Sequence, residues 1–199
     1  MIWNPSEGTL SPKLNIKPNS WTKRGLWATV AQIFHPIGIC APYLLPGRCL
    51  LQEVCEDVNE WDDPIPDDLR RKWENWLKYL PCLEKLKIQR CYWKTIADVY
   101  ELHTFCNSSE KGLVCVSYLK KKKEITYHIV FVMGRSKVVP KKTTFTIPRL
   151  ELIAASLGAK MHCQIRQSIK LPMSKGYLYT DSTVVLDWIN NVDKRLKSG

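Results

Sequence analysis

Residues 146–152 (TIPRLEL) and residues 177–182 (YLYTDS) are the two stretches that decide the fold. Pro148 favours a helix start, because a first-turn residue needs no amide hydrogen for the helical ladder. The apolar residues after it recur at helical spacing and predict the buried face of one long helix. They are Leu150, Ile153, Leu157, Met161 and Ile165. Residues 176–179 predict a strand, and a helix predicted over 184–189 follows it at once.

Three apolar runs before the long helix predict strands over residues 102–106, 113–119 and 125–133. Asn107-Ser108-Ser109 would end the first strand, and Lys120 to Glu124 would turn the chain between the second and third. Short links between consecutive strands predict an antiparallel meander. The whole order is β-β-β-α-β-α, an α/β fold with α+β order.

The upstream third of the chain predicts helices. Leu26, Val30 and Phe34 follow a helical period, and His35-Pro36-Ile37-Gly38 stops that helix. Leu50, Leu51 and Val54 predict a second helix, for which Pro46-Gly47 marks the start or a kink. These segments predict a helical region that precedes the strands.

A third helix follows an acidic turn, where Asp67 or Asp68 could cap its first turn. Its apolar stripe contains two tryptophans, which we interpret as core residues rather than a stacking platform for nucleic acid. The stripe consists of Leu69, Trp73, Trp76, Leu77 and Leu80. We therefore divide the chain into residues 1–21, a helical segment over 22–92, and the mixed domain over 93–199.

Composition excludes several classes of protein. The proportions are globular, with 45% hydrophobic and 25% charged residues. The longest apolar stretch, near residues 37–45, is far short of the roughly 20 residues that span a bilayer. The N-terminus has no signal-peptide pattern, so we expect an intracellular protein, cytoplasmic or nuclear, without a membrane partner. The eight cysteines include no CxxC pair, and we interpret them as free, buried thiols.

Three polar residues lie at predicted element ends: Asn107, Glu151 and Asp181. If the first and fourth strands are neighbours, with the helix across them, these positions converge on one edge of the sheet. Carboxylates there would hold Mg²⁺ or Mn²⁺, which can activate water for phosphodiester cleavage. Each residue also has a structural explanation. Glu151 could be a first-turn helix acid, Asp181 a cap and Asn107 a turn former.

The net charge of +11 favours a polyanionic partner. Basic residues cluster at Lys120 to Lys123 and again at Arg135, Lys137, Lys141 and Lys142. The second cluster precedes the long helix and could contact a phosphate backbone. Simple solvation of a hairpin remains the alternative, above all for the first cluster. We interpret His103, His128 and His162 as structural or surface residues, because none has a metal ligand at suitable spacing.

Several motifs together resemble the RNase H-like region of BEL/Pao-type retrotransposon Pol polyproteins. They are the helix entry at residues 146–152, the Tyr179-Thr180-Asp181-Ser182 segment, and Phe105-Cys106-Asn107-Ser108-Ser109, where the family has Phe-Ser-Asp-Ala-Ser. Upstream, residues 1–5, 23–38 and 61–80 resemble the end of the reverse transcriptase palm and the helical thumb or connection segment. The resemblance covers nearly the whole chain.

The resemblance implies a domain that cuts RNA in RNA–DNA hybrids with two Mg²⁺ ions and a set of carboxylates. Glu151 and Asp181 take the second and third positions, whereas Asn107 replaces the first aspartate. The fourth carboxylate belongs to a later helix, beyond Gly199, so we expect a C-terminally truncated RNase H-like domain. We favour a nucleic-acid-binding fragment that is impaired or inactive as an enzyme. The alternatives are a metal-dependent RNase H-type nuclease and a fragment that does not fold alone.

Overall fold

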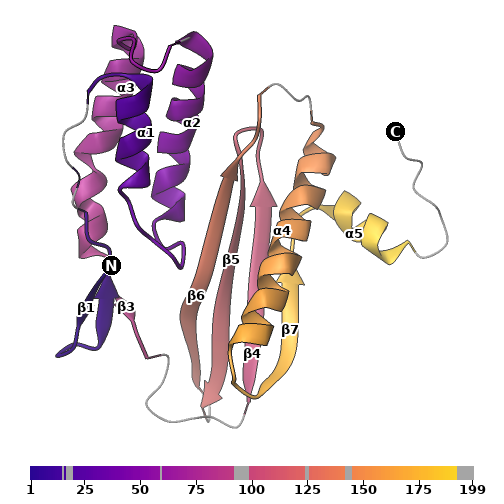
Figure 1. Ribbon diagram of the computed structural model, residues 1–199. Coiled ribbons are helices and arrows are strands. Elements are labelled where there is room, and N and C mark those ends of the chain that lie inside the picture. Colours follow the sequence, from indigo (N-terminus) through magenta and orange to yellow (C-terminus); the bar gives the residue numbers. More distant parts are fainter. Residues whose placement is uncertain are drawn as a thin grey trace. The chain divides into compact units, whose positions relative to one another are not determined.

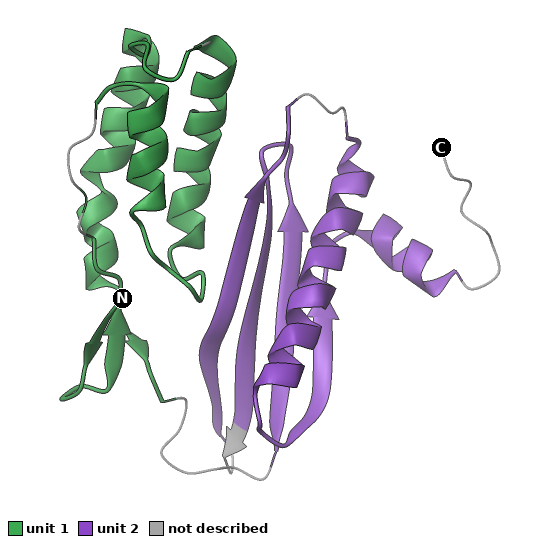
Figure 2. Cartoon of the chain, viewed as in Figure 1, with its two compact units in different colours: residues 1–96 green, residues 97–199 purple. Residues whose placement is uncertain are grey.

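The computed structural model describes residues 1–14, 16, 20–58, 60–91, 99–123, 126–141 and 145–191. Contacts divide the chain into two compact units, residues 1–96 and residues 97–199 (Figure 2). Each unit has its own sheet and its own helices. None of the helices in the described ranges has both the length and the apolar character needed to cross a bilayer.

The first unit begins with a small antiparallel sheet. Strand β1 (Ile2–Asn4) pairs with β2 (Thr9–Ser11), and β2 also pairs with β3 (Ile88–Gln89) from the end of the unit. Gly8 lies in the β1–β2 turn with φ of +66°, a backbone conformation that glycine adopts without steric cost. The sheet therefore joins the two ends of a chain segment whose middle is helical.

The helices of the first unit are α1 (Lys23–Ala31), α2 (Ala41–Asp57) and α3 (Asp67–Lys78), followed by the 3₁₀ helix η1 (Leu80–Lys85). The prediction that the first helix continues through Phe34 is wrong. That helix ends before Phe34, whose exposed fraction is 65%. Pro46 does not start the second helix either, because α2 begins at Ala41 and includes it.

The core of the first unit forms around α3. Trp73 and Trp76 are buried with ring centroids 4.8 Å apart, which confirms that they are core residues. The predicted cap is wrong. Pro66 occupies the cap position in an extended conformation, and Asp67 and Asp68 already belong to the first helical turn. Their negative charges still interact favourably with the positive, N-terminal end of the helix dipole.

The second unit is a four-stranded sheet with two helices (Figure 1). In space its strands run in the order β6 (Thr126–Val138), β5 (Gly112–Lys123), β4 (Tyr100–Ser108) and β7 (Met173–Tyr179). The first three are antiparallel, and β7 pairs in parallel with β4. Helix α4 (Ile147–Ser168) crosses one face, and α5 (Thr183–Asn190) follows β7. The predicted β-β-β-α-β-α order is confirmed.

The hairpin between β5 and β6 is longer than predicted. Residues 120–123 belong to β5 rather than to a turn, and they pair with residues 126–129 of β6. Lys121 lies on the helix-covered face and is 7% exposed, because a lysine stem can cover apolar surface. Glu124, which was also predicted to belong to the turn, lies outside the described residues.

Helix α4 packs on the sheet through a stripe that differs from the predicted one. Leu150, Met161 and Ile165 are buried as predicted, but Ile153 is exposed. Ala154 and Gly158 take the contact positions instead. A Cβ atom on Gly158 would lie 1.9 Å from Cys106 Sγ, so the close approach of helix and sheet requires glycine there.

The eight cysteines are free thiols, as predicted. Cys40, Cys106 and Cys115 are buried, and burial raises the pKa of Cys106 to about 11. The prediction of burial is wrong for four others, which are exposed on helices or loops. These are Cys55, Cys82, Cys91 and Cys163.

Candidate functional site

The β4–β7 pair determines where the candidate site lies. The last paired residues of the two parallel strands are Phe105 and Tyr179. Asn107 and Asp181 each lie two residues beyond them, at the carboxyl ends of neighbouring strands. The prediction that the first and fourth strands of this unit are neighbours in the sheet is therefore confirmed.

Glu151 reaches this edge from α4. The helix begins at Ile147, so Glu151 lies in its second turn, and the prediction of a first-turn acid is wrong. The Ser182 hydroxyl donates a hydrogen bond to the Glu151 carboxylate. Ser182 is buried and directly follows Asp181, so this bond ties the α4 carboxylate to the segment that carries the second acid.

The same serine also begins α5. Its Oγ accepts a hydrogen bond from the Val185 amide at 3.2 Å, the usual arrangement of an N-cap. Val185 is fully buried and holds the short helix against the rest of the unit. Asp181 itself is exposed, and its carboxylate precedes the cap. The cap role predicted as an alternative for Asp181 thus belongs to Ser182.

Asn107 is exposed near the end of β4. Its Oδ1 atom accepts a hydrogen bond from the Ser108 amide at 2.6 Å. The amide oxygen is thus already engaged by the next residue, and Asn107 still belongs to β4, where it pairs with Val114, so the predicted role as a turn former is wrong. The buried Oγ of Ser108 has no hydrogen-bond partner among the described residues. Because side chains alternate along β4, this hydroxyl lies on the opposite face of the sheet from the Asn107 side chain.

This donor set fits a hard divalent cation only in part. Carboxylate, amide and hydroxyl oxygens are suitable ligands for Mg²⁺. Asn107, however, contributes no negative charge where a bridging carboxylate would stand. Within the described ranges, no three His, Cys, Asp or Glu side chains gather into a metal-binding group. The residues present thus supply two carboxylates at this edge, Glu151 and Asp181, and an uncharged amide at the third position.

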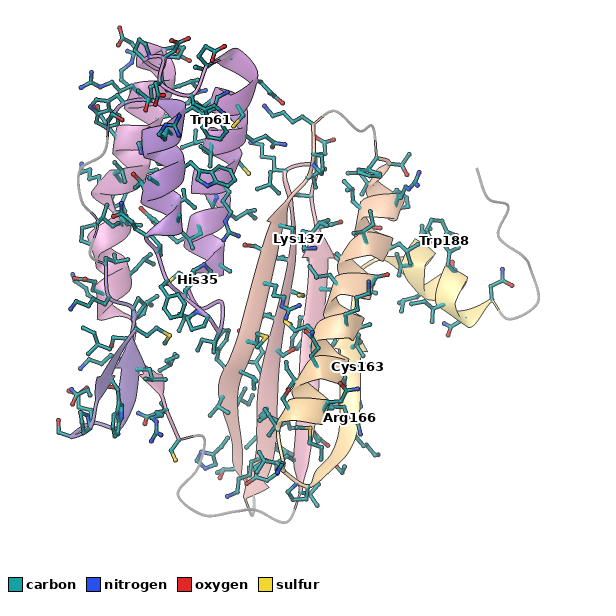
Figure 3. The ribbon with its side chains drawn as sticks, in the orientation of Figure 1. His35, Trp61, Lys137, Cys163, Arg166 and Trp188 are labelled. Carbon is teal, nitrogen blue, oxygen red and sulfur yellow. The ribbon has the colours of Figure 1, made fainter. Side chains whose placement is uncertain are left out.

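The predicted basic residues lie on β6 and just after it. Arg135 donates from its guanidinium to Gln164 Oε1 of α4 at 2.8 Å. Lys137 is exposed and pairs across β5 with Leu113, whose partner on β4 is Ser108 (Figure 3). Lys137 thus lies at the same end of the sheet as Asn107, two strands or about 10 Å away. Lys141 is exposed beyond β6, and Lys142 lies outside the described residues.

The family described as "Pao retrotransposon-like RNaseH-like domain" matches residues 22–182. The chain belongs to this family. Among solved structures, it is similar to a foamy viral protease-reverse transcriptase in complex with dsDNA, with 14% identity and a TM-score of 0.45 over 92% of this chain. It is also similar to the foamy viral protease-reverse transcriptase dRH in complex with ds DNA, with 15% identity and a TM-score of 0.43 over 92% of this chain.

This family member spans about a third of the length of those viral chains, 35% of the first and 34% of the second. No curated protein matches it. Family membership confirms the resemblance to the RNase H-like region of Pao-type retrotransposons that the sequence motifs predict.

The structure also shows polar contacts that the sequence pattern could not reveal. His162 is buried under the sheet, and its Nδ1 lies 2.9 Å from the Thr104 hydroxyl, which lies 2.7 Å from the Ser117 hydroxyl. Burial lowers the pKa of His162, and so does the charge of Arg166, which lies one turn further along the same helix. The prediction of a structural role for His162 is confirmed. Helical spacing alone would have indicated only that it faces the core.

Proposed function

We propose that this Pao-family chain is an RNase H-like scaffold that binds nucleic acid and is impaired in cleaving the RNA strand of RNA–DNA hybrids. The observation that carries the proposal is Asn107. It stands at the end of β4, beside the segment of Asp181, where hydrolysis with paired metal ions requires a carboxylate. Its oxygen is uncharged and accepts a backbone hydrogen bond.

Glu151 and Asp181 are the residues that would hold Mg²⁺ or Mn²⁺. Such an ion, when bound, polarises a phosphoryl oxygen and lowers the pKa of a bound water. Ser182 would orient Glu151, because its hydroxyl donates to that carboxylate and leaves the second carboxylate oxygen for the ion. The chain thus supplies two of the carboxylates and one of the orienting contacts that the chemistry needs.

The missing charge is the expected cause of impairment. Removing one preorganised group that stabilises transition-state charge costs about 3 kcal/mol, on the order of a hundredfold in rate. An amide in place of a bridging carboxylate also weakens ion binding. We therefore expect the chain to bind a hybrid but to cleave it slowly.

The alternative function is a metal-dependent RNase H-type nuclease. The observation that favours it is the Ser182–Glu151 hydrogen bond, because an oriented carboxylate is typical of a working metal site. Under this alternative, Glu151 and Asp181 suffice for turnover, and Asn107 reduces only the rate.

The test uses the full chain and a hybrid with a labelled RNA strand, in Mg²⁺ or Mn²⁺. We expect binding with cleavage close to background, and faster cleavage in the Asn107→Asp variant. Glu151→Gln should abolish the activity gained by Asn107→Asp, whereas Asp187→Asn, which removes an exposed carboxylate of α5, should not. Efficient cleavage by the unaltered chain that Glu151→Gln eliminates would contradict the proposal and establish the nuclease alternative.

A further inference from the structure

The face of the second sheet opposite α4 carries a row of aromatic side chains. Side chains alternate along a strand, so Leu102 and Thr104 of β4 face α4 and are fully buried, whereas His103 and Phe105 point to the other face. The directly opposed residues of the neighbouring strands share that face. They are Tyr177 and Tyr179 of β7, Tyr118 of β5 and Phe131 of β6.

Rings from β4 and β7 stack on one another. The Phe105 and Tyr179 centroids are 4.6 Å apart with an interplanar angle of 11°. His103 lies 4.9 Å from Tyr177 with an angle of 18°. These four rings form a continuous stack along two strands. Separations and angles in this range are those at which aromatic pairs attract one another.

The row continues onto β5 and β6. Tyr118 meets Phe105 edge-on at 6.2 Å, and Phe131 meets Tyr118 edge-on at 6.1 Å. Six rings therefore extend across all four strands. Phe105 and Tyr179 remain 43% and 40% exposed, so the centre of the row is accessible to solvent.

Hydrogen bonds hold the row in place. His103 Nδ1 lies 2.9 Å from the Tyr179 hydroxyl, and His103 Nε2 lies 3.2 Å from Glu101 Oε2. Lys120 Nζ also contacts Glu101, at 3.0 Å. Rings fixed in this way lose little conformational entropy when a ligand binds, which favours recognition.

We propose that this aromatic face binds single-stranded nucleic acid, with bases stacking on its rings. Base stacking needs aromatic surface rather than a specific sequence, and sheets that present such rings are a common platform for it. The proposal rests on the nucleic-acid binding proposed above, but not on cleavage.

Charge and position favour a nucleic acid over a protein partner. Lys120 and Lys175 lie on this face at one end of the row, Glu101 is the opposing charge, and the chain as a whole carries +11. At the other end, Asn107 continues the same face two residues beyond Phe105. A single-stranded nucleic acid whose bases stack along β4 and β7 would thus run from the lysines towards the candidate metal-binding edge.

The test compares two ligands by fluorescence anisotropy with the full chain: a labelled single strand of about 12 nucleotides, and a hybrid duplex of the same length. The Phe105→Leu, Tyr179→Leu double variant keeps apolar side chains but removes both rings. We expect it to lower single-strand affinity at least about tenfold while duplex affinity stays unchanged. Tyr179→Phe, which keeps the ring and loses only the His103 contact, is the matched control and should bind like the unaltered chain.

A second measurement avoids the variants. A 5-iodouracil-substituted single strand, irradiated with the unaltered chain, should cross-link to peptides that contain Phe105 or Tyr179. Cross-links confined to other peptides would overturn the proposal. Unchanged single-strand affinity in a folded double variant would also overturn it. A third contrary outcome is a protein dimer, detected by sedimentation, that the double variant disrupts while single-strand binding stays the same.

The outcomes also separate the two proposals. Single-strand binding without duplex binding would support the aromatic face and contradict the proposed binding of hybrids. Duplex binding without single-strand binding would overturn only the aromatic face.

Discussion

The hydroxyl of Ser182 donates a hydrogen bond to the carboxylate of Glu151, and the same oxygen accepts from the Val185 amide. One side chain therefore caps α5 and orients the acid of α4. Because the serine is buried and next to Asp181, it also fixes the start of the segment that carries the second candidate metal ligand.

Ser182→Ala should destabilise the second unit. The substitution removes an N-cap and a hydrogen bond to a carboxylate, so we expect the free energy of unfolding to fall by about 1–2 kcal/mol. Urea denaturation followed by circular dichroism measures it. Ser182→Thr keeps the hydroxyl and serves as the control. Equal stability of the alanine variant and the unaltered chain would show that the hydrogen bond has no energetic role.

Gly158→Ala should destabilise the chain, although alanine is the better helix former by about 1 kcal/mol. The new Cβ would lie 1.9 Å from Cys106 Sγ, and such overpacking costs about 1–3 kcal/mol. Cys106→Ala should relieve the clash, because the Cys106 Cβ is 3.6 Å from the same position. We expect the double variant to be more stable than Gly158→Ala alone, as measured by thermal unfolding. Additive losses would refute the contact.

The stability of the second unit should fall in mildly acidic solution because of His162. Burial, and secondarily Arg166, lowers the pKa of this imidazole in the folded state below its ordinary value of about 6.5. As the pH falls, the unfolded chain therefore binds a proton at His162 before the folded chain does. The contribution of neutral His162 to the free energy of unfolding is complete above about pH 6.5 and is lost as the pH falls towards the folded-state pKa.

Unfolding free energies at pH 7.5 and pH 5.5 test this dependence. His162→Gln should reduce the loss between the two pH values. The pKa of His35 in the first unit is also lowered, by burial and then by Arg48, so the comparison must be made between chains that both keep His35. An identical pH dependence in the His162→Gln variant would exclude the proposed role of this imidazole.

Lys137→Gln should weaken duplex binding, because its exposed ammonium lies at the end of the sheet that also contains Asn107. Loss of one phosphate contact reduces the slope of log affinity against log salt by about one. Lys85→Gln, an exposed lysine of the first unit, is the matched control. A duplex affinity and salt slope unaffected by Lys137→Gln would remove this lysine from the interface.

The fold could be predicted where local pattern determines it. Strand alternation and short links gave the meander, and the YLYTDS stretch gave the strand beside β4. Predictions were wrong where tertiary packing determined which of several neighbouring residues with suitable side chains took a buried or capping position. Small side chains at Ala154 and Gly158 rotated the buried stripe of α4 away from Ile153, and Pro66 took the cap expected of Asp67.

The candidate site was predictable only as a set of positions. Asn107 and Asp181 could be placed at strand ends because a parallel register follows from the element order. The Ser182–Glu151 bond could not be anticipated, because it joins residues 31 apart and depends on side-chain direction. The aromatic row was also missed, since its members come from four strands and become one surface only after pairing.

The parallel pairing of β4 with β7 has a consequence for how the chain reaches its native state. Hairpin contacts among β4, β5 and β6 join residues close in sequence, whereas β7 can dock only after the chain has passed through α4. Loop closure over that distance is entropically costly, so the meander should form early and the β7 edge late. Amide hydrogens of β5 should then exchange most slowly with solvent, and those of β7 should be the first to open.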